Sequence, residues 1–472
     1  MASNWKPSSG KGNSWSSGGT LPPLAGAPGT VALLLGISRS YGLQPGGRLA
    51  GEPLRTAGAR RGEAVATAGE GTERDATVGP GQPEPAPWAA PLAAELEALA
   101  PERRRRLRSL APCGSAGLRP VDGAGGPPLL DLASNDYLGL AHHPSLQQAA
   151  SAAMARDGLG AGASRLVSGS RPVHGELEQA LGAWLGRPRV LLFPSGFQAN
   201  LAAVQALADR HSLVLADRLI HHSLLTGVKA SGARLRRFPH NNLEALAQQL
   251  ERAQREVPGR RLLVLSESLF SMEGTSPDVP ALAELCRRHG AALLLDEAHA
   301  LGVLGPGGRG LGLGQAGVSL ISGTFGKAFG GGGAFLAADE LLGEWLLQHS
   351  GPFRYTTALA PPLAAAALAA LRGIQAEPQR GAALLQRAQR WRDQLEAAGW
   401  PRPPGQGPIL PLLVGEDARA LELQRRLEAA GLLSVAIRPP TVPEGSARLR
   451  LVLRHDLPAG SLERLLAALG SP

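Results

Sequence analysis

The sequence predicts an α/β protein with a mostly parallel β-sheet in a large domain, followed by a smaller α+β C-terminal domain. Three observations support this prediction. Short, continuously apolar runs recur along the middle of the chain, as expected for strands buried on both faces of a parallel sheet. Helical periods separate several of these runs, which indicates repeated βα winding. Beyond residue 352 the pattern changes to long helices with isolated strands.

The N-terminal segment, residues 1–86, differs in composition from the rest of the chain. It is rich in Gly, Ser, Pro and Ala and shows no sustained helical or strand period, so we expect it to be disordered. Residues 1–51 contain several Ser but no Asp or Glu, which also resembles an organelle transit peptide. A third interpretation places the true start downstream, although the next methionine is Met154.

Three further segments follow. Residues 87–140 are expected to form an N-terminal helix and a substrate-contacting segment, because 88–110 has a helical period and 129–133 is β-like. Residues 141–352 are expected to form the large domain and residues 353–472 the small one. In the large domain the strand candidates are 189–193, 212–216, 262–266, 292–296 and 318–322, with helices between them such as 199–208 and 243–255. In the small domain we expect helices over 361–371, 381–398 and 419–430 and strands over 408–414 and 447–453.

Charge and composition narrow the function classes. The net charge is +9, but basic residues are scattered, and the dense run 103–106 with Arg108 is more typical of a solvated helix face than of a nucleic-acid site. We therefore expect no nucleic-acid partner. No apolar run reaches the ~20 residues of a membrane span, so no membrane partner is expected. The two cysteines, Cys113 and Cys286, form no disulfide framework, which favours a cytoplasmic location unless the N-terminal extension targets an organelle.

Lys327 is the first candidate for chemistry. Only four of the 48 basic residues are lysines, and an amine can act as a nucleophile where a guanidinium cannot. Glycines and aromatic residues surround Lys327 in the sequence, and desolvation there would lower its pKa and favour imine chemistry. A Walker-type phosphate loop is excluded, because that loop needs Gly where Ile321 stands and Ser or Thr where Ala328 stands.

Polar residues follow several predicted strands, at the edge where open parallel sheets bind ligands. Asp296 ends an apolar run, and a buried carboxylate is costly unless a cation such as a protonated pyridine nitrogen meets it. A helix cap or an ion pair would explain Asp296 alone, and loop positions would explain His299 and His221 alone. Asp296, Glu297 and His299 lack a partner cluster with metal-ligand spacing, so we expect no metal.

A phosphate group should find hydrogen-bond donors near the same edge. The backbone amides of Gly196 and Phe197 begin a predicted helix after a strand, which is a favourable place for an anion. Thr324 adds a hydroxyl group, and the His221 ring could lie flat on an aromatic cofactor. Two patterns with the spacing of dinucleotide-binding glycines, 305–310 and 158–163, do not join a strand to a helix and are interpreted as glycine-rich loops.

Together these motifs resemble the α-oxoamine synthases, which are fold-type I pyridoxal-phosphate (PLP) enzymes that join an amino acid to an acyl thioester. The resemblance runs from about residue 105 to the C-terminus, through segments 134–140, 193–200, 217–221, 268–274, 296–299 and 324–327. It implies a mostly parallel seven-stranded sheet. It also implies a homodimer with shared active sites, because residues 355–357 resemble a segment that reaches the partner subunit's phosphate.

The resemblance implies a role for each matching residue. Lys327 would hold pyridoxal 5′-phosphate as a Schiff base, Asp296 would pair with the pyridine nitrogen, and His221 would stack on the ring and meet the substrate; these three are the predicted catalytic residues. The other predicted cofactor contacts are His299 and Ser271 at the phenolic oxygen, and Thr324, Gly196, Phe197 and Thr356 at the phosphate or nearby.

Substrate choice rests on the C-terminal motifs. Segments 436–443 and 447–451, with the loop 160–169, are most similar to family members that condense L-alanine with a pimeloyl thioester in biotin biosynthesis, the thioester being carried by coenzyme A or a carrier protein. The predicted substrate contacts are Arg438 with Asn135 at the amino-acid carboxylate, Thr441, and Arg108 as the best candidate for an N-terminal arginine. Members that use glycine or serine are the nearest alternative, and a non-catalytic binding protein is the alternative from another class.

Overall fold

The computed structural model describes residues 87–99, 107–122, 125–256 and 258–472. The chain divides into two compact units, residues 1–98 and 99–472. The described part of the first unit is helix α1 (Ala89–Ala98). The helical pattern expected over 88–110 therefore extends too far, because residues 107–109 are not helical and strand β1 begins at Leu110. The expectations for residues 1–86 and for the basic run 103–106 lie outside the described residues.

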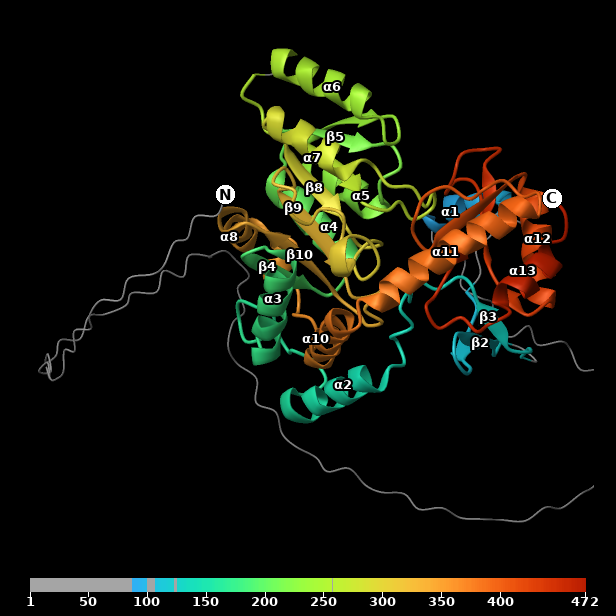
Figure 1. Ribbon diagram of the computed structural model, residues 1–472. Helices are drawn as coiled ribbons and strands as arrows, with labels where there is room; N and C mark the ends of the chain where they lie inside the picture. The colour runs from blue at the N-terminus through green and yellow to red at the C-terminus, as the bar shows by residue number, and fades with distance from the viewer. Residues whose placement is uncertain (1–86, 100–106, 123–124, 257) are drawn as a thin grey trace, which may run out of the picture. The chain divides into compact units, whose positions relative to one another are not determined.

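The second unit contains a seven-stranded sheet with the order β4-β10-β9-β8-β7-β5-β6 (Figure 1). Strand β10 runs antiparallel to both of its neighbours, and the other neighbouring pairs are parallel. The predicted mostly parallel seven-stranded sheet is thereby confirmed. Its strands are β4 (Arg189–Phe193), β5 (Leu213–Asp217), β6 (Arg234–Phe238), β7 (Leu262–Glu267), β8 (Ala292–Asp296), β9 (Leu320–Thr324) and β10 (Ala334–Ala338).

Five of these strands lie within two residues of the predicted apolar runs, whereas β6 and β10 have no predicted counterpart. Strand β6 is at the edge of the sheet, and its sequence RLRRF has no apolar run to detect. Strand β10, with the sequence AFLAA, is fully buried, but alanine is depleted in strands and gives a weak signal. Both strands therefore form mainly because neighbouring strands pair with them, and less because of the strand preference of their own residues.

In every strand of this sheet except the edge strand β6, alternate residues enter two separate apolar clusters, one on each face of the sheet. Leu191 and Phe193 of β4 pack with helices α4 (Gly196–Leu207) and α5 (His222–Ser231), whereas Val190 and Leu192 pack into the larger cluster. The helices that contribute to that larger cluster include α2 (Pro144–Asp157), α3 (Pro172–Leu185), α6 (Leu243–Glu256), α7 (Val279–Arg288) and α10 (Pro361–Ala376). The sheet is therefore buried on both faces, which explains its continuously apolar strands.

The C-terminal part has mixed α and β structure, as predicted. A three-stranded sheet has the order β11-β14-β13, and a four-stranded sheet has the order β1-β2-β3-β12, so that the segment before residue 140 pairs with the C-terminal part through β3 and β12. The domain boundaries at residues 140 and 352 stay predictions. The strands are β1 (Leu110–Pro112), β2 (Gly117–Pro120), β3 (Leu129–Asp131), β11 (Ile409–Gly415), β12 (Leu432–Leu433), β13 (Val435–Ile437) and β14 (Ala447–Val452), and the remaining helices are α8 (Glu340–His349), α9 (Gly351–Arg354), α11 (Gln379–Ala397), α12 (Asp417–Ala429) and α13 (Ser461–Leu469).

Candidate active site

The carboxyl ends of the neighbouring strands β7, β8 and β9 and the first turn of α4 meet at a cavity of about 190 Å³. Most of the predicted cofactor residues contribute to this one cavity, although they come from separate parts of the chain. Its lining consists of Gly196, Phe197, Asn200, His221, Glu267, Asp296, Ala298, His299, Ser322, Gly323, Thr324 and Lys327. This convergence is what the strand-end argument predicted.

Lys327 lies in the turn between β9 and β10. Its carbonyl accepts the Gly330 amide at 2.8 Å, and Gly330 adopts a left-handed φ of 64° that lets the turn pass close to the backbone of Ala141. Burial lowers the pKa of Lys327 to about 8, against the opposing effect of Asp296 and Glu267. A substantial fraction of the amine is therefore neutral near physiological pH, which suits attack on an aldehyde.

Asp296 ends strand β8 and is only 6% exposed. Its carboxylate accepts the Asn200 side-chain amide at 2.7 Å and the Ala298 backbone amide at 2.9 Å. Asn200 also donates to the Ser223 hydroxyl at 2.9 Å, while its Oδ1 is buried without a hydrogen-bond partner among the described residues. The carboxylate is thus held in place and has capacity left for a cationic group in the cavity.

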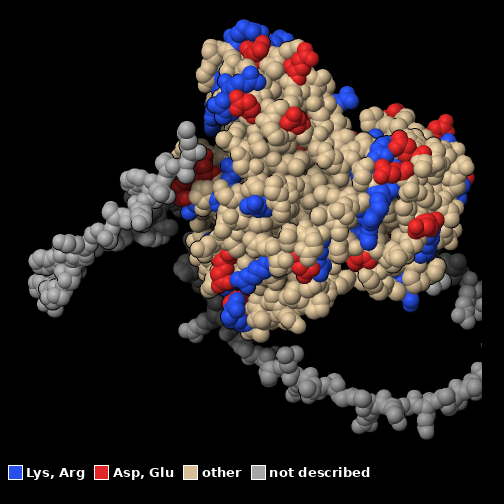
Figure 2. Space-filling view, in the orientation of Figure 1, with Lys and Arg blue, Asp and Glu red and all other residues tan. Residues whose placement is uncertain are grey.

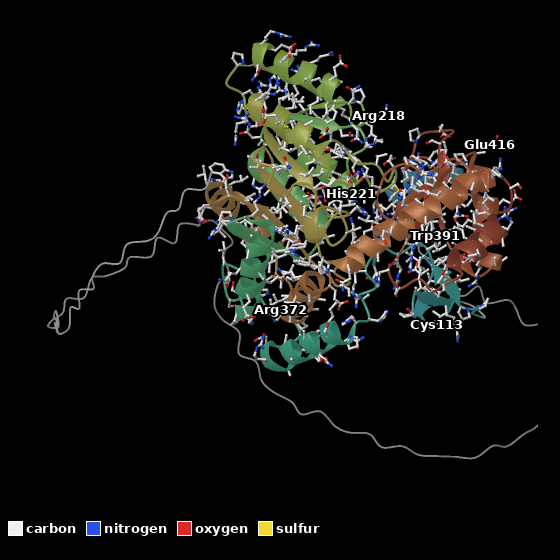
Figure 3. All side chains as sticks on the ribbon, viewed as in Figure 1. Cys113, Arg218, His221, Arg372, Trp391 and Glu416 are labelled. Atoms are coloured by element: carbon white, nitrogen blue, oxygen red, sulfur yellow. The ribbon has the colours of Figure 1, made fainter. Side chains whose placement is uncertain are left out.

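His221, which is labelled in Figure 3, caps the N-terminus of α5. Its Nδ1 lies 2.7 Å from the Ser223 hydroxyl, and its backbone amide donates to Glu267 at 2.6 Å. These contacts fix the ring at the rim of the cavity. Burial lowers the pKa of His221. The charge of Asp296 opposes this shift, and the charge of Lys327 adds to it. The neutral ring is suited to stacking on an aromatic group.

Glu267 and Asn200 belong to the cavity, and sequence reasoning missed both. Glu267 is 3% exposed, and burial raises its pKa well above the usual value, reinforced by Asp296. A signal was available for Glu267, since it ends an apolar strand just as Asp296 does, and the two residues pair in register on β7 and β8. Asn200 has no comparable signal, because a polar residue in the first turns of a helix is usually solvated.

His299, which lines the cavity, also belongs to a buried hydrogen-bond network. Its Nδ1 lies 2.5 Å from the Tyr137 hydroxyl, and burial lowers its pKa well below the usual value. Arg450 of β14 donates to Asn135 Oδ1 at 2.9 Å and to the Ser271 carbonyl at 2.6 Å. The predicted residues Asn135 and Ser271 are thus connected through Arg450, which the sequence analysis did not select.

The phosphate contacts predicted from the sequence gather at the start of α4. Gly196 is the first residue of this helix, and a Cβ atom placed on it would lie 3.6 Å from the Thr324 Cβ. The Thr324 hydroxyl donates to the Gly333 carbonyl at 2.9 Å, and Gln198 donates to the Thr356 hydroxyl at 2.6 Å. The free amides at the N-terminus of α4 therefore lie beside Thr324, which is a favourable place for a phosphate.

The three remaining predicted residues do not line the cavity. Arg438 follows β13, and its carbonyl accepts the backbone amide of Thr441, an exposed residue, at 3.0 Å. Arg108 forms a surface ion pair with Glu428 of α12 at 2.5 Å. Because none of the three residues lines the cavity, their contacts with substrate stay predictions.

The cavity residues fit PLP. Lys327 offers a buried amine for the aldehyde, Asp296 a buried carboxylate for the ring nitrogen, and the start of α4 an anion site for the phosphate. The described residues contain no group of three or more His, Cys, Asp and Glu side chains suited to a metal ion. Among the same residues, no helix is both long and apolar enough to cross a membrane.

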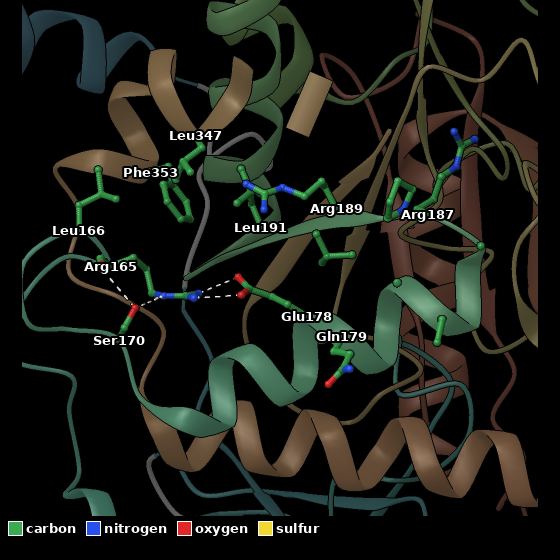
Figure 4. A pocket seen from close by; sticks show the side chains of 15 residues that line it. Arg165, Leu166, Ser170, Glu178, Gln179, Arg187, Arg189, Leu191, Leu347 and Phe353 are labelled. Carbon is green, nitrogen blue, oxygen red and sulfur yellow. Dashed lines mark hydrogen bonds and ion pairs between the residues drawn. The ribbon is translucent and has the colours of Figure 1, made fainter. Parts of the chain in front are cut away.

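A second hollow, of about 710 Å³, lies between α3 and β4 (Figure 4). Arg165 and Glu178 in its lining are joined by two hydrogen bonds of 2.7 and 2.9 Å, and Arg189 bonds to Glu344, outside the lining, at 2.9 Å. On the face drawn in Figure 2, basic and acidic side chains are likewise mixed and separated by wide uncharged areas. The lining of this hollow contains no lysine and one carboxyl side chain, that of Glu178, whereas the smaller cavity contains Lys327 with Asp296 and Glu267.

Comparison with known proteins agrees with this site. Residues 127–469 match the family of class I and II aminotransferases, so the chain is a fold-type I PLP enzyme. The chain is 46% identical over 348 residues to the 8-amino-7-oxononanoate synthase of Chromohalobacter salexigens, covering 73% of this chain and 89% of that protein. It is 45% identical to the protein of the same name from Anaeromyxobacter dehalogenans, covering 80% and 94%. The chain therefore belongs to the 8-amino-7-oxononanoate synthase family.

Solved structures give the same fold. Serine palmitoyltransferase from Sphingomonas wittichii superposes with a TM-score of 0.75 at 28% identity, covering 81% of this chain and 96% of that one. The enzyme of the same name from S. paucimobilis, solved with PLP bound, has a TM-score of 0.74 at 25% identity, with the same coverage. PLP is thus the cofactor that both the family and the cavity indicate.

Proposed function

We propose that the protein condenses L-alanine with a pimeloyl thioester to give 8-amino-7-oxononanoate, CO2 and a free thiol, a step of biotin biosynthesis. The observation that supports this most is the convergence of Lys327, Asp296 and His221 on one cavity in a chain that is 45–46% identical to proteins of that name. The acyl carrier is coenzyme A or a carrier protein, and the chain's chemistry accommodates both.

Each part of the site would have a separate role in the reaction. PLP, when bound, supplies an electron sink for the charge that develops at the amino-acid α-carbon. The Lys327 Nζ removes the α-proton and later returns one, which its pKa of about 8 allows near neutral pH. Asp296, held by Asn200, stabilises a protonated ring nitrogen. His221 covers one face of the ring and limits the access of water.

We propose that the amino-acid carboxylate binds near Asn135 and Arg450. The guanidinium of Arg450 is buried beside Asn135, and its charge lowers the pKa of both Lys327 and His299. Arg438, with Thr441, remains the candidate from motif similarity, and Arg108 remains the candidate for a contact with the acyl chain. Comparing Arg450→Met with Arg438→Met separates the two arginines, since the one that binds the carboxylate loses affinity for L-alanine.

We further propose that the protein acts as a cytoplasmic homodimer with shared sites. Tyr355, next to Thr356, is 80% exposed, and Val167 is 79% exposed, so both leave apolar surface that a partner subunit can cover. A partner subunit that covers these side chains would bring the partner's phosphate site close to Thr356 of this subunit. Sedimentation of the purified holoenzyme tests the dimer.

The function is tested with Lys327→Ala, using Lys229→Ala on α5 as the control because Lys229 is the other lysine among the described residues. The first variant is expected to lose all turnover and the visible absorbance of lysine-bound PLP, and the control to keep both. Turnover by Lys327→Ala would contradict the proposed mechanism. An assay offering L-alanine, glycine and L-serine in competition addresses the substrate; preference for glycine or serine would favour a sister enzyme.

A further inference from the structure

We propose that His240 is a positioning residue for the end of the site that receives the amino-acid carboxylate. It stands in a chain of hydrogen bonds, Asp217–His240–Thr275, and none of the three residues lines the cavity. This inference rests on the proposed function, because it assigns His240 an effect on the binding of the amino acid through Arg450.

On one side, His240 is fixed by Asp217 at the carboxyl end of β5. Asp217 is fully buried, and its two oxygens lie 3.0 and 3.1 Å from His240 Nδ1. The same carboxylate accepts the backbone amides of Leu219 and Asn241, both at 2.8 Å. Asp217 therefore shapes the short turn that leads to His221 and at the same time sets the orientation of the His240 ring.

On the other side, His240 holds the loop 268–275 that follows β7. Its Nε2 lies 2.7 Å from the Thr275 hydroxyl, and its ring meets Phe270 edge-on with centroids 4.4 Å apart. The Thr275 carbonyl accepts the Phe270 amide at 2.9 Å, which closes the loop. Because Asp217 occupies Nδ1, Nε2 is the ring atom left for this loop, and the Asn241 side-chain amide lies farther from it, at 3.3 Å.

The loop in turn fixes two arginines of β14. The Ser271 carbonyl accepts from Arg450 at 2.6 Å, the Met272 carbonyl accepts from Arg448 at 3.2 Å, and Glu273 pairs with Arg448 at 3.5 Å. A shift of this loop by even a fraction of an ångström moves Arg450 relative to Asn135. His240 thus couples the end of β5, which leads to His221, to the arginine that bonds to Asn135.

An Asp–His–Thr series also resembles a hydrolytic triad, in which the threonine hydroxyl would be a nucleophile. A nucleophile needs space for a substrate at its oxygen, and the cavity of the site does not reach Thr275. The loop contacts of Thr275 explain its hydroxyl without any bond being made or broken. We therefore assign the series to positioning.

The test uses the holoenzyme of Thr275→Val, which removes one hydroxyl group with little change of volume, and of Thr275→Ser, which keeps it. Thr226→Val is the control, because the Thr226 hydroxyl bonds only locally, to the His222 carbonyl at 3.0 Å. We expect Thr275→Val to raise the KM and the Kd for L-alanine roughly tenfold, about 1.4 kcal/mol, with kcat and PLP affinity within twofold of wild type. Thr275→Ser and Thr226→Val should bind L-alanine like wild type.

A second readout does not depend on turnover. In the apoenzyme, Thr275→Val should speed hydrogen exchange at the Phe270 and Gly274 amides, while exchange elsewhere in β7 is unchanged. An unchanged L-alanine Kd in Thr275→Val, or equal losses of alanine and PLP affinity, would overturn the positioning role. Wild-type enzyme that fails to bind L-alanine at all would instead overturn the proposed function, so the two failures are distinguishable.

Discussion

Lys327 reacts as an amine only when deprotonated, and its burial determines the pH at which that happens. With a pKa of about 8 rather than 10.5, the covalent attachment of PLP to apoenzyme should speed up as pH rises through about 8 and level off above it. Visible absorbance after rapid mixing of apoenzyme with PLP, between pH 6.5 and 9.5, measures this. A rate still rising steeply between pH 8.5 and 9.5 would show that the amine has an ordinary pKa.

Glu297, beside Asp296, illustrates a buried carboxyl with a structural task. Its side chain accepts the backbone amides of Gly312 at 2.6 Å and Leu311 at 3.2 Å, and burial raises its pKa to about 7. A carboxyl whose folded-state pKa exceeds its unfolded value contributes stability below the unfolded pKa, and loses it as pH rises through the folded pKa. The protein should therefore lose stability from Glu297 between about pH 4.5 and 7.

Glu297→Gln tests this, because a neutral amide cannot titrate. Relative to wild type, its free energy of unfolding should improve on going from pH 5 to pH 8, by an amount on the order of 3 kcal/mol for a shift of this size. Urea unfolding at both pH values measures the difference. Parallel pH profiles for the two proteins would show that Glu297 does not titrate in this range.

Residue-scale chemistry was predictable where a residue type was itself unusual. Lys327 stood out by rarity and Asp296 by its place at the end of an apolar run, and both line the cavity. Asn200 and Arg450 could not be found in the same way. Their importance comes from contacts with Asp296 and Asn135, which lie 96 and 315 residues away in the sequence.

At the scale of elements, the predicted strands coincide with the observed ones where leucine, valine or isoleucine residues mark the strand, and fail at the arginine-rich edge strand β6 and the alanine-rich strand β10. The turn between β9 and β10 is another element that the sequence pattern does not predict. Gly330 has a left-handed φ of 64°, and a Cβ atom there would lie 2.4 Å from the Ala141 nitrogen. Periodicity carries no information on so close an approach.

Gly330→Ala should therefore destabilise the protein by at least about 2 kcal/mol, since the left-handed conformation alone costs an alanine 1–2 kcal/mol. The displaced turn also carries Lys327, so PLP affinity should fall. Gly331→Ala is the matched control, because its Cβ atom would meet nothing closer than the Phe325 carbonyl at 3.7 Å. Thermal unfolding and PLP titration compare the two; equal behaviour would contradict a tight turn at Gly330.

At the scale of the whole second unit, the segment 107–140 is tied to the C-terminal part by contacts that no local pattern predicts. Strand β3 pairs with β12, and the Leu132 carbonyl accepts the Val452 amide at 2.8 Å. Beside them, Arg454 lies within 3.0 Å of Asp131, 3.4 Å of Asp136 and 2.9 Å of Asp456. Residues more than 300 positions apart thus form one buried charge network, and the sequence contains no sign of which arginine closes it.

Arg454→Met should cost roughly 3–5 kcal/mol of stability, because removing one partner leaves buried carboxylates without a cation. Burial already raises the pKa of Asp136, and Arg454 opposes that rise. Without Arg454 the pKa of Asp136 rises further, so the loss should be larger at pH 7 than at pH 5, where protonation relieves the unpaired charge. Arg287→Met is the control, since its exposed pair with Glu284 should be worth less than about 1 kcal/mol. Urea unfolding of both variants at the two pH values decides, and a loss equal to that of the control would show that the network does not join the two parts of the unit.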